Sequence, residues 1–182
     1  MHDELTVVDI QKMEEEIKYR TEVLAPELRA EMRRTREFGD LSENAEYKEA
    51  KREKRRNDSR IRYLNNMINT AKVIEIEKND GVCLFDWVTI YNEKNGKEKT
   101  VQIVTTLRQN ALLGFVSKES PLGKALLGCK VGQRQKVTVN DENSYFIKVV
   151  KIEKGTDNAD LPINGGYEPQ KIEKQVPPHL VE

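Results

Sequence analysis

Three acidic residues at a strict spacing of three, Asp40, Glu43 and Glu46, lie in the stretch GDLSENAEY between two basic segments. Carboxylates three positions apart on a helix are neighbours, with Cβ atoms about 5–6 Å apart, so two of them can share one hard cation. Mg²⁺ is usually held by one or two protein carboxylates, and water and phosphate complete its shell. The stretch is therefore a candidate for part of a metal site that another molecule completes.

The same residues also fit a structural role at the start of a helix. Gly39 suits a turn because it has no Cβ and adopts positive φ freely. Asp40 fits the N-cap of the following helix and Glu43 fits its third position, as in a capping box with Asp in place of Ser or Thr. Capping explains two acids, but it does not explain why both flanking segments are basic. Both interpretations stay open at this point.

A narrow apolar seam indicates a long helix before this stretch. Thr6 fits the N-cap, with Asp9 three residues later. The apolar residues that follow are mostly three or four positions apart: Ile10, Met13, Ile17, Leu24, Leu28 and Met32. Pro26 interrupts the helix. Because an interior proline removes a backbone hydrogen bond and clashes with the preceding turn, we expect a kink or a break there.

A second helix repeats the seam after the acidic stretch. Its seam positions alternate steps of four and three: Ala50, Lys54, Asn57, Ile61, Leu64, Ile68 and Ala71. An asparagine on such a seam, here Asn57, usually fixes the register of the paired helices. A stripe this narrow needs a partner helix, and only a short loop separates the two. We therefore expect an antiparallel coiled-coil hairpin with GDLSENAEY at its tip.

Charge is balanced over the whole chain but not along it. Lys and Arg together number 31, as do Asp and Glu, so simple bulk attraction to nucleic acid is excluded. Residues 48–62 nevertheless carry eight basic residues against three acidic ones. Such a segment is either a solvated helix face or a salt-sensitive contact for a phosphate backbone. In the second case, Lys51, Arg52 and Arg55 are the predicted contacts with that backbone.

The helical period stops near residues 77–82, which we predict to be a linker. Five runs typical of β-strands follow, at residues 87–92, 100–106, 112–117, 135–140 and 145–152. Ser120 can cap a short helix that starts at Pro121 and ends at Gly128. These runs indicate a small antiparallel sheet packed on one helix.

Three further features bound the class of protein. Residues 155–182 are polar and contain Gly and Pro, which predicts a flexible tail. Cys83 and Cys129 lack metal-ligand spacing and are predicted to be free thiols. Without a targeting signal or a long apolar span, the chain is expected to be cytoplasmic and not to enter a membrane.

GDLSENAEY, with a proline-interrupted helix before it and a basic helix after it, resembles the tip of the bacterial transcript cleavage factors of the GreA/GreB family. RIRYLNNMINTAKVIE resembles the end of their second helix, and SPLGKALLGCKVGQ resembles a signature of their C-terminal domain. Together the matches cover residues from about 5 to about 153. Their combination at this separation makes the resemblance specific.

The resemblance implies an α+β protein. A coiled-coil hairpin with an acidic tip would occupy residues 1–76, and an FKBP-like antiparallel β-sheet domain with a short helix would occupy residues 83–154 and dock on RNA polymerase. The chain would act as a monomer.

The implied activity depends on the hairpin entering the secondary channel of a backtracked polymerase. Asp40 and Glu43 would help to hold a weakly bound Mg²⁺ and orient a water, so that the polymerase cleaves the 3′ end of the nascent RNA. The chain would donate ligands and would not be an enzyme alone. The residues implied to support the tip are Gly39, Asn44, Glu46 and Tyr47. Because both acids are present, the chain does not resemble the inhibitory relatives with altered tips.

Three other functions stay open. A regulator could occupy the same channel without assisting cleavage, although the retained acids argue against it. A prolyl isomerase activity in the second domain depends on fold analogy alone. A generic helical scaffold would leave the paired motifs unexplained. A cleavage assay on backtracked complexes separates the first of these from the leading hypothesis.

Overall fold

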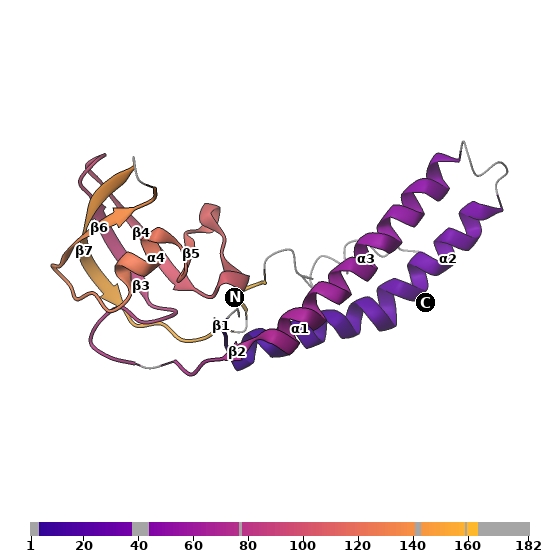
Figure 1. Cartoon of the computed structure of the whole chain (residues 1–182), viewed down its shortest axis with the longest axis horizontal. Helices are drawn as coiled ribbons and strands as arrows, with labels where there is room; N and C mark the ends of the chain where they lie inside the picture. Colours follow the sequence, from indigo (N-terminus) through magenta and orange to yellow (C-terminus); the bar gives the residue numbers. More distant parts are fainter. Residues whose placement is uncertain (1–3, 38–43, 77, 141–142, 159, 164–182) are drawn as a thin grey trace, which may run out of the picture. The chain divides into compact units, whose positions relative to one another are not determined.

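The computed structural model describes residues 4–37, 44–76, 78–140, 143–158 and 160–163, and its mixed α+β fold confirms the expected class (Figure 1). The chain divides into two compact units. One contains Ile10–Lys72, and the other contains Glu4–Asp9 together with the chain from Val73 onward. The segment Glu4–Asp9, which the sequence pattern placed in the hairpin, therefore packs with the second unit.

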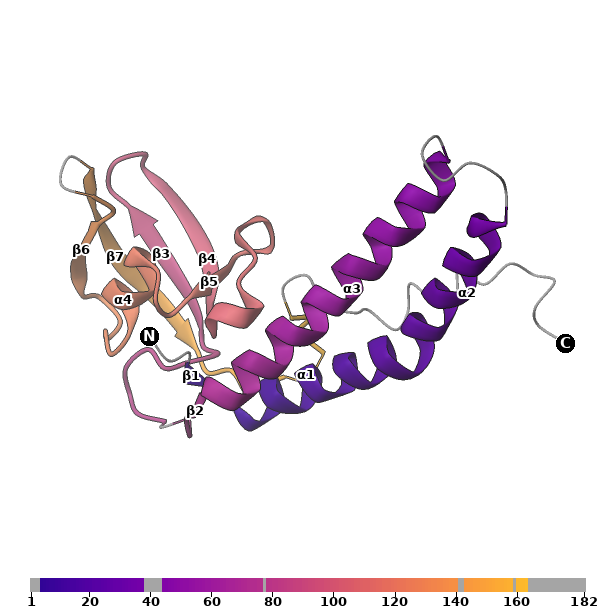
Figure 2. The same cartoon turned by 45° about the vertical axis from the view of Figure 1, so that its right-hand side comes forward.

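The first unit is a hairpin of two helical arms (Figure 2). Its elements are the α-helix α1 (Val7–Tyr19), the π-helix η1 (Arg20–Leu24), and the α-helices α2 (Ala25–Arg36) and α3 (Ala45–Thr70). In the contacts between the two arms, residue numbers fall along the first arm as they rise along the second. The Asn44 side chain bonds to Thr35, and the Arg60 side chain bonds to Glu16. The predicted antiparallel pairing is therefore confirmed.

Pro26 is accommodated without breaking the first arm. It lies in the first turn of α2, directly after η1, and the N–H of Ala25 donates to the carbonyl of Arg20, five residues back. The wider π turn rearranges the hydrogen bonds just before the proline, whose ring would otherwise clash with the preceding turn. The arm changes direction between α1 and α2, as Figure 2 shows, so the structure has a kink and not a gap.

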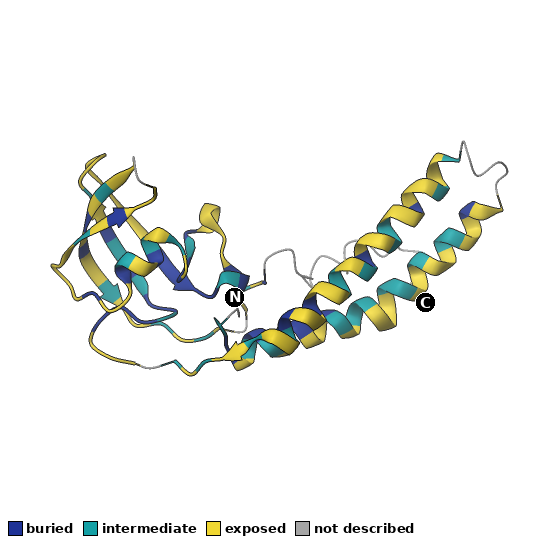
Figure 3. Ribbon diagram, in the orientation of Figure 1, coloured by how far each residue is buried: buried dark blue, intermediate teal, exposed yellow. Residues whose placement is uncertain are grey.

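The seam of α3 follows the predicted heptad with one change. Ala50, Asn57 and Leu64 are buried, but the next buried position is Met67, and Ile68 is only partly buried. Figure 3 shows these buried positions at intervals along the arm. In the part of α1 that belongs to the hairpin unit, the fully buried residues are Met13 and Glu16. A glutamate on the seam was not expected from the apolar pattern.

The second unit is built on a five-stranded sheet in the order β5-β4-β3-β7-β6. The strands are β3 (Trp87–Asn92), β4 (Lys97–Val104), β5 (Phe115–Ser117), β6 (Arg134–Thr138) and β7 (Ser144–Glu153), and a separate two-stranded sheet pairs β1 (Glu4–Leu5) with β2 (Lys72–Val73). The described helical turns are η2 (Thr106–Arg108), η3 (Ala111–Leu113) and α4 (Pro121–Leu126). All five predicted strands are present; β3 has the predicted ends, and each of the other four is shifted at one end or both.

The expectation of a wholly antiparallel sheet was wrong at one edge. β5 pairs with β4 in parallel, with Gln102 opposite Phe115. The chain makes the two short turns η2 and η3 after β4 and so returns to run in the same direction. The other pairs in this sheet are antiparallel.

The core of this unit is aliphatic. Its buried residues are Val82, Val88, Ile90, Val101, Ile103, Leu126, Cys129, Val137, Ile147 and Val149. The predicted cap of α4 is confirmed, because the N–H of Gly123 donates to Ser120 Oγ at 3.0 Å. Among the aromatic residues of this unit, Phe85 is fully buried and Phe146 is exposed.

The prediction of a flexible tail from residue 155 was wrong for its first part. Arg108, which is fully buried, bonds to the carbonyl of Asn158 and pairs with Asp157. Ile163 is also buried. The contacts of Arg108 hold residues 157–158 in the second unit, and residues 164–182 lie outside the described part. Within the described residues, no helix is both long and apolar enough to cross a membrane.

Candidate functional site

The end of the hairpin is fixed by Asn44. This residue has an extended backbone (φ −75°, ψ 99°) and its Oδ1 accepts a hydrogen bond from the N–H of Tyr47 at 2.9 Å, so it is the N-cap of α3. Its Nδ2 donates to the carbonyl of Thr35, in the last turn of α2, at 2.7 Å. One side chain therefore caps the second arm and ties it to the first.

Of the two interpretations left open, the capping one, with Asp40 as the N-cap and Glu43 at the third position of the helix, was wrong, because α3 begins at Ala45 and its N-cap is Asn44. Both residues precede Asn44, whose extended backbone marks the start of the helix. The side-chain amide of Asn44 accepts the hydrogen bond of a free N–H in the first turn as well as an Asp carboxylate would. Helical spacing within α3 therefore does not relate Asp40 to Glu43. Gly39, Asp40 and Glu43 themselves lie outside the described residues.

The first turn of α3 places the two other predicted tip residues. Glu46 lies 3.7 Å from Arg34 of the first arm, and its side chain is 68% exposed. Arg34 also forms two hydrogen bonds with Glu31, which lower the pKa of the Glu31 carboxyl. Tyr47 is half-buried and lies under the ammonium of Lys51, 6.0 Å from the ring centroid. The Glu46 contact joins the two arms, whereas the Tyr47 contact lies within α3.

Basic side chains on one face of α3 line a hollow of about 500 Å³. Its lining residues are Lys48, Lys51, Arg52, Arg55, Arg56 and Ser59. The three predicted RNA contacts are thus brought together. Lys48 and Arg56 were not among the predicted contacts. Their spacing already places them on the same helix face, because Lys48 lies three, four and seven residues before the predicted contacts and Arg56 lies four residues after Arg52.

Ion pairs neutralise part of this face. Arg52 lies 3.5 Å from Glu49, and Arg56 pairs with Glu53. Among the ion pairs of the described residues, none includes Lys48, Lys51 or Arg55. The uncompensated positive charge therefore lies at these three positions along the hollow, and the other two bases are partly compensated.

A buried polar network below the tip holds the arms in register. Arg60 of α3 donates two hydrogen bonds to the carboxylate of Glu16, at 2.9 and 3.0 Å, and Arg20 donates to the same carboxylate at 2.6 Å. Arg20 also bonds to Asn57 through its guanidinium and its carbonyl. The predicted register role of Asn57 is thus shared by a charged pair that the apolar pattern did not reveal.

The described residues contain no cluster of three or more His, Cys, Asp or Glu side chains that could hold a metal ion. A shared cation at the hairpin end would therefore depend on Asp40 and Glu43. Two carboxylates suit Mg²⁺, which commonly takes one or two from a protein and completes its shell elsewhere.

Comparisons with known proteins match both units of the chain. The family model described as "Transcription elongation factor, N-terminal" matches residues 4–73, and that described as "Transcription elongation factor, GreA/GreB, C-term" matches residues 69–154. The transcription elongation factor GreA of Thermosipho melanesiensis is 40% identical over 133 residues, which are 73% of this chain and 85% of that protein. The GreA protein of Thermoanaerobacter pseudethanolicus is 39% identical over 152 residues, 82% of this chain and 96% of that protein.

Among solved structures, the GreA factor homolog 1 protein of Thermus thermophilus is 24% identical, with a TM-score of 0.40. The match covers 85% of this chain and 100% of that chain.

Proposed function

The chain belongs to the GreA/GreB family of transcription elongation factors, and we propose that it rescues backtracked RNA polymerase. The hairpin end enters the secondary channel of the polymerase and stimulates Mg²⁺-dependent cleavage at the 3′ end of the nascent RNA. The observation that carries this proposal is the position of Asp40 and Glu43 in the sequence. Both lie in the short stretch of sequence between α2 and the Asn44 cap, and the basic segment of α3 follows in the sequence.

The metal belongs to the polymerase, and this chain would contribute carboxylate ligands. When bound, Mg²⁺ supplies positive charge that stabilises the attacking and leaving oxygens of phosphodiester hydrolysis. Asp40 and Glu43 would increase the occupancy of a loosely held ion and orient the attacking water. The chain therefore acts on RNA only with the polymerase, and not as an enzyme alone.

The basic face of α3 would guide the extruded RNA. Lys51, Arg52 and Arg55 line one hollow with Lys48, and these charges lie within about three helical turns of the Asn44 cap. Contacts with the phosphate backbone would weaken as the salt concentration rises. Changing Lys48 and Arg55 to Glu would lower the crosslinking of the RNA 3′ end, whereas unchanged crosslinking would make this face a solvated surface.

The sheet unit would dock on the outer rim of the channel. The turn η3 exposes two leucines, Leu112 by 97% and Leu113 by 60%, and Ala111 of the same turn lines a hollow of about 450 Å³. Contiguous exposed apolar side chains are typical of binding surfaces. Changing both leucines to Ser would weaken polymerase binding. The matched change of Val139, which is 53% exposed, would leave it unaltered.

The deciding experiment uses stalled, backtracked transcription complexes supplied with Mg²⁺ and the full chain. The unaltered chain should shorten the transcripts. Asp40→Asn and Glu43→Gln should bind the polymerase as tightly and lose the cleavage. Glu37→Gln is the matched control, because Glu37 is an exposed acid directly after α2 to which the proposal gives no role.

Full cleavage by both the Asp40 and the Glu43 variants would reject the metal role. Binding without cleavage by the unaltered chain would instead support the regulator that occupies the channel without assisting hydrolysis.

A further inference from the structure

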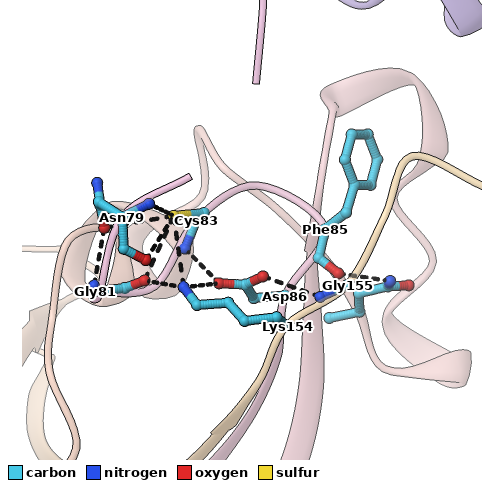
Figure 4. Close-up of polar contacts among 8 residues, drawn as sticks. Asn79, Gly81, Cys83, Phe85, Asp86, Lys154 and Gly155 are labelled. Carbon is cyan, nitrogen blue, oxygen red and sulfur yellow. Dashed lines mark hydrogen bonds and ion pairs between the residues drawn. The ribbon is translucent and has the colours of Figure 1, made fainter. Parts of the chain in front are cut away.

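A thiol, an ammonium and a carboxylate meet in the sheet unit, where the loop of residues 79–86 lies against the end of β7 (Figure 4). Cys83 is 5% exposed. The Nζ of Lys154 lies 3.7 Å from Cys83 Sγ, 2.9 Å from Asp86 Oδ2 and 2.5 Å from the carbonyl of Gly81. A primary amine is therefore held beside a buried sulfur.

The backbone around this cluster keeps the two groups in place. The N–H of Cys83 donates to Asp86 Oδ2 at 2.8 Å, and the N–H of Gly155 donates to Asp86 Oδ1 at 3.0 Å. Phe85 is buried and adopts a positive φ of 68°, which is unusual for a bulky residue. A Cβ on Gly155 would lie 1.8 Å from the carbonyl oxygen of Phe85. The loop and the strand end therefore approach too closely for either to move independently.

Polar groups surround the sulfur of Cys83, and the partly exposed side chain of Lys154 lies between this sulfur and solvent. Cys83 Sγ accepts a hydrogen bond from the N–H of Asn79 and lies 3.4 Å from the carbonyl of Gly81. The Lys154 side chain is 43% exposed. A small oxidant such as hydrogen peroxide, which is close to water in size, can approach along this side chain.

Cys129 provides an internal comparison. It is buried to almost the same degree, at 4% exposure, but it belongs to the aliphatic core and its thiol donates to the carbonyl of Ala125. Burial raises the pKa of the Cys129 thiol, which disfavours the reactive thiolate. The two cysteines thus differ mainly in whether the amino group of a lysine faces the sulfur.

We propose that hydrogen peroxide converts Cys83 and Lys154 into a covalent cross-link with a bond between sulfur and nitrogen. Peroxide first oxidises the thiol to a sulfenic acid and releases one water. The Lys154 amine then attacks the sulfur, the sulfur–oxygen bond breaks, and a second water leaves. The sulfur loses two electrons, and the peroxide takes them up. A thiol reductant returns these electrons and regenerates the free thiol and amine.

Asp86 controls the second step. Desolvation lowers the pKa of Lys154, but the hydrogen bond and charge of Asp86 outweigh it, so the pKa is raised overall. The amine must therefore release a proton to solvent, which its partly exposed side chain reaches, before it attacks the sulfur. Because the folded pKa is raised, the cross-link should form faster as the pH increases. This inference is independent of the proposed role in transcript cleavage.

The test treats the full chain with hydrogen peroxide and measures the intact mass and the peptides made without reduction. We expect a mass loss of two hydrogens and a linked peptide pair that contains Cys83 and Lys154, both reversed by a thiol reductant. Cys83→Ser and Lys154→Arg should abolish the link. The arginine retains the positive charge beside Asp86 but has no primary amine.

Two matched variants serve as controls. Cys129→Ser and Lys151→Arg should cross-link like the unaltered chain, because neither residue faces Cys83. A link with one additional oxygen between the same two residues would support the pairing and show that a second peroxide is consumed. The proposal would be overturned if Cys83 were oxidised to the same unlinked product in the unaltered chain and in Lys154→Arg. It would also be overturned if Cys129 reacted first.

Discussion

The hairpin unit and the sheet unit bury their charges in different places. In the hairpin, the buried Glu16 lies on the seam between the arms and binds the partly buried Arg20 and Arg60. In the sheet unit the central core is aliphatic, and the buried pair of Arg108 and Asp9 lies outside it. The hairpin therefore uses charge for alignment, and the sheet unit uses it to secure chain ends.

This difference follows from how much apolar surface each unit can bury. A seam between two helices has few apolar contacts, and apolar side chains alone would allow the arms to slide by one heptad. A charged pair that fits in only one register removes that freedom. A sheet packed on a helix is already fixed by its hydrogen-bond ladder and dense core. In that unit the buried arginine connects the N-terminal segment with residues after β7.

The largest expected effect comes from removing the buried arginine of the sheet unit. Arg108 and Asp9 are both fully buried, with Nε and Oδ1 2.5 Å apart, and Arg108 also pairs with Asp157. Arg108→Leu would leave two carboxylates without their cation and should lower the free energy of unfolding by about 3–5 kcal/mol. Chemical denaturation followed by the fluorescence of Trp87, the single tryptophan, measures this change.

Arg134→Leu is the control for this experiment. Arg134 forms an ion pair with Glu93 in the same unit, but both side chains are exposed to solvent, so the change should be far smaller. Equal destabilisation by the two variants would contradict the distinction between buried and exposed pairs.

The second prediction concerns the charged seam of the hairpin. Glu16→Gln keeps the size of the side chain but removes the charge that accepts hydrogen bonds from Arg20 and Arg60. We expect a loss of about 2–3 kcal/mol, because hydrogen bonds to charged groups are stronger than neutral ones and the two arginines are only partly buried. Thermal unfolding followed by far-UV circular dichroism measures it.

Glu15→Gln provides the comparison, since Glu15 is an exposed neighbour on the same helix. If Glu16→Gln were no more destabilising than Glu15→Gln, the seam would owe its register to apolar packing alone.

Local and periodic features were predictable from the sequence. The capping box of α1 is present, with reciprocal hydrogen bonds between Thr6 and Asp9, and the Ser120 cap and the strands are where residue type and alternation placed them. These features depend on residues close together in the chain, so the pattern itself contains them.

Features that depend on distant partners were not predictable. Glu16 and Arg108 are charged, and charged residues are rarely buried unless they are paired. Their partners Arg60 and Asp9 lie 44 and 99 residues away in the sequence. The N-cap of α3 was predicted wrongly for another reason. Asp and Asn are both good N-caps, and the contact of Asn44 with Thr35, which favours Asn44, cannot be seen in the sequence.

The smallest expected effect separates the two roles of Asn44. Asn44→Ala removes both the cap of α3 and the bond to Thr35, and should cost about 1 kcal/mol. Asn44→Asp keeps an acceptor for the N–H of Tyr47, in a position that favours negative charge, but it loses the donor to Thr35. Hydrogen exchange at Tyr47 should therefore accelerate in the Ala variant and stay slow in the Asp variant.

Cleavage of backtracked RNA then shows which role serves the proposed function. A loss of 1 kcal/mol corresponds to about a fivefold change in the population of the ordered end. If the cap alone positions the acids, Asn44→Asp should cleave like the unaltered chain while Asn44→Ala is up to about fivefold slower. If the link between the arms also matters, both variants should be slower, and the Asp variant should be slow despite normal exchange at Tyr47. Full activity in Asn44→Ala would mean that neither contact of this side chain determines where the acidic residues are held.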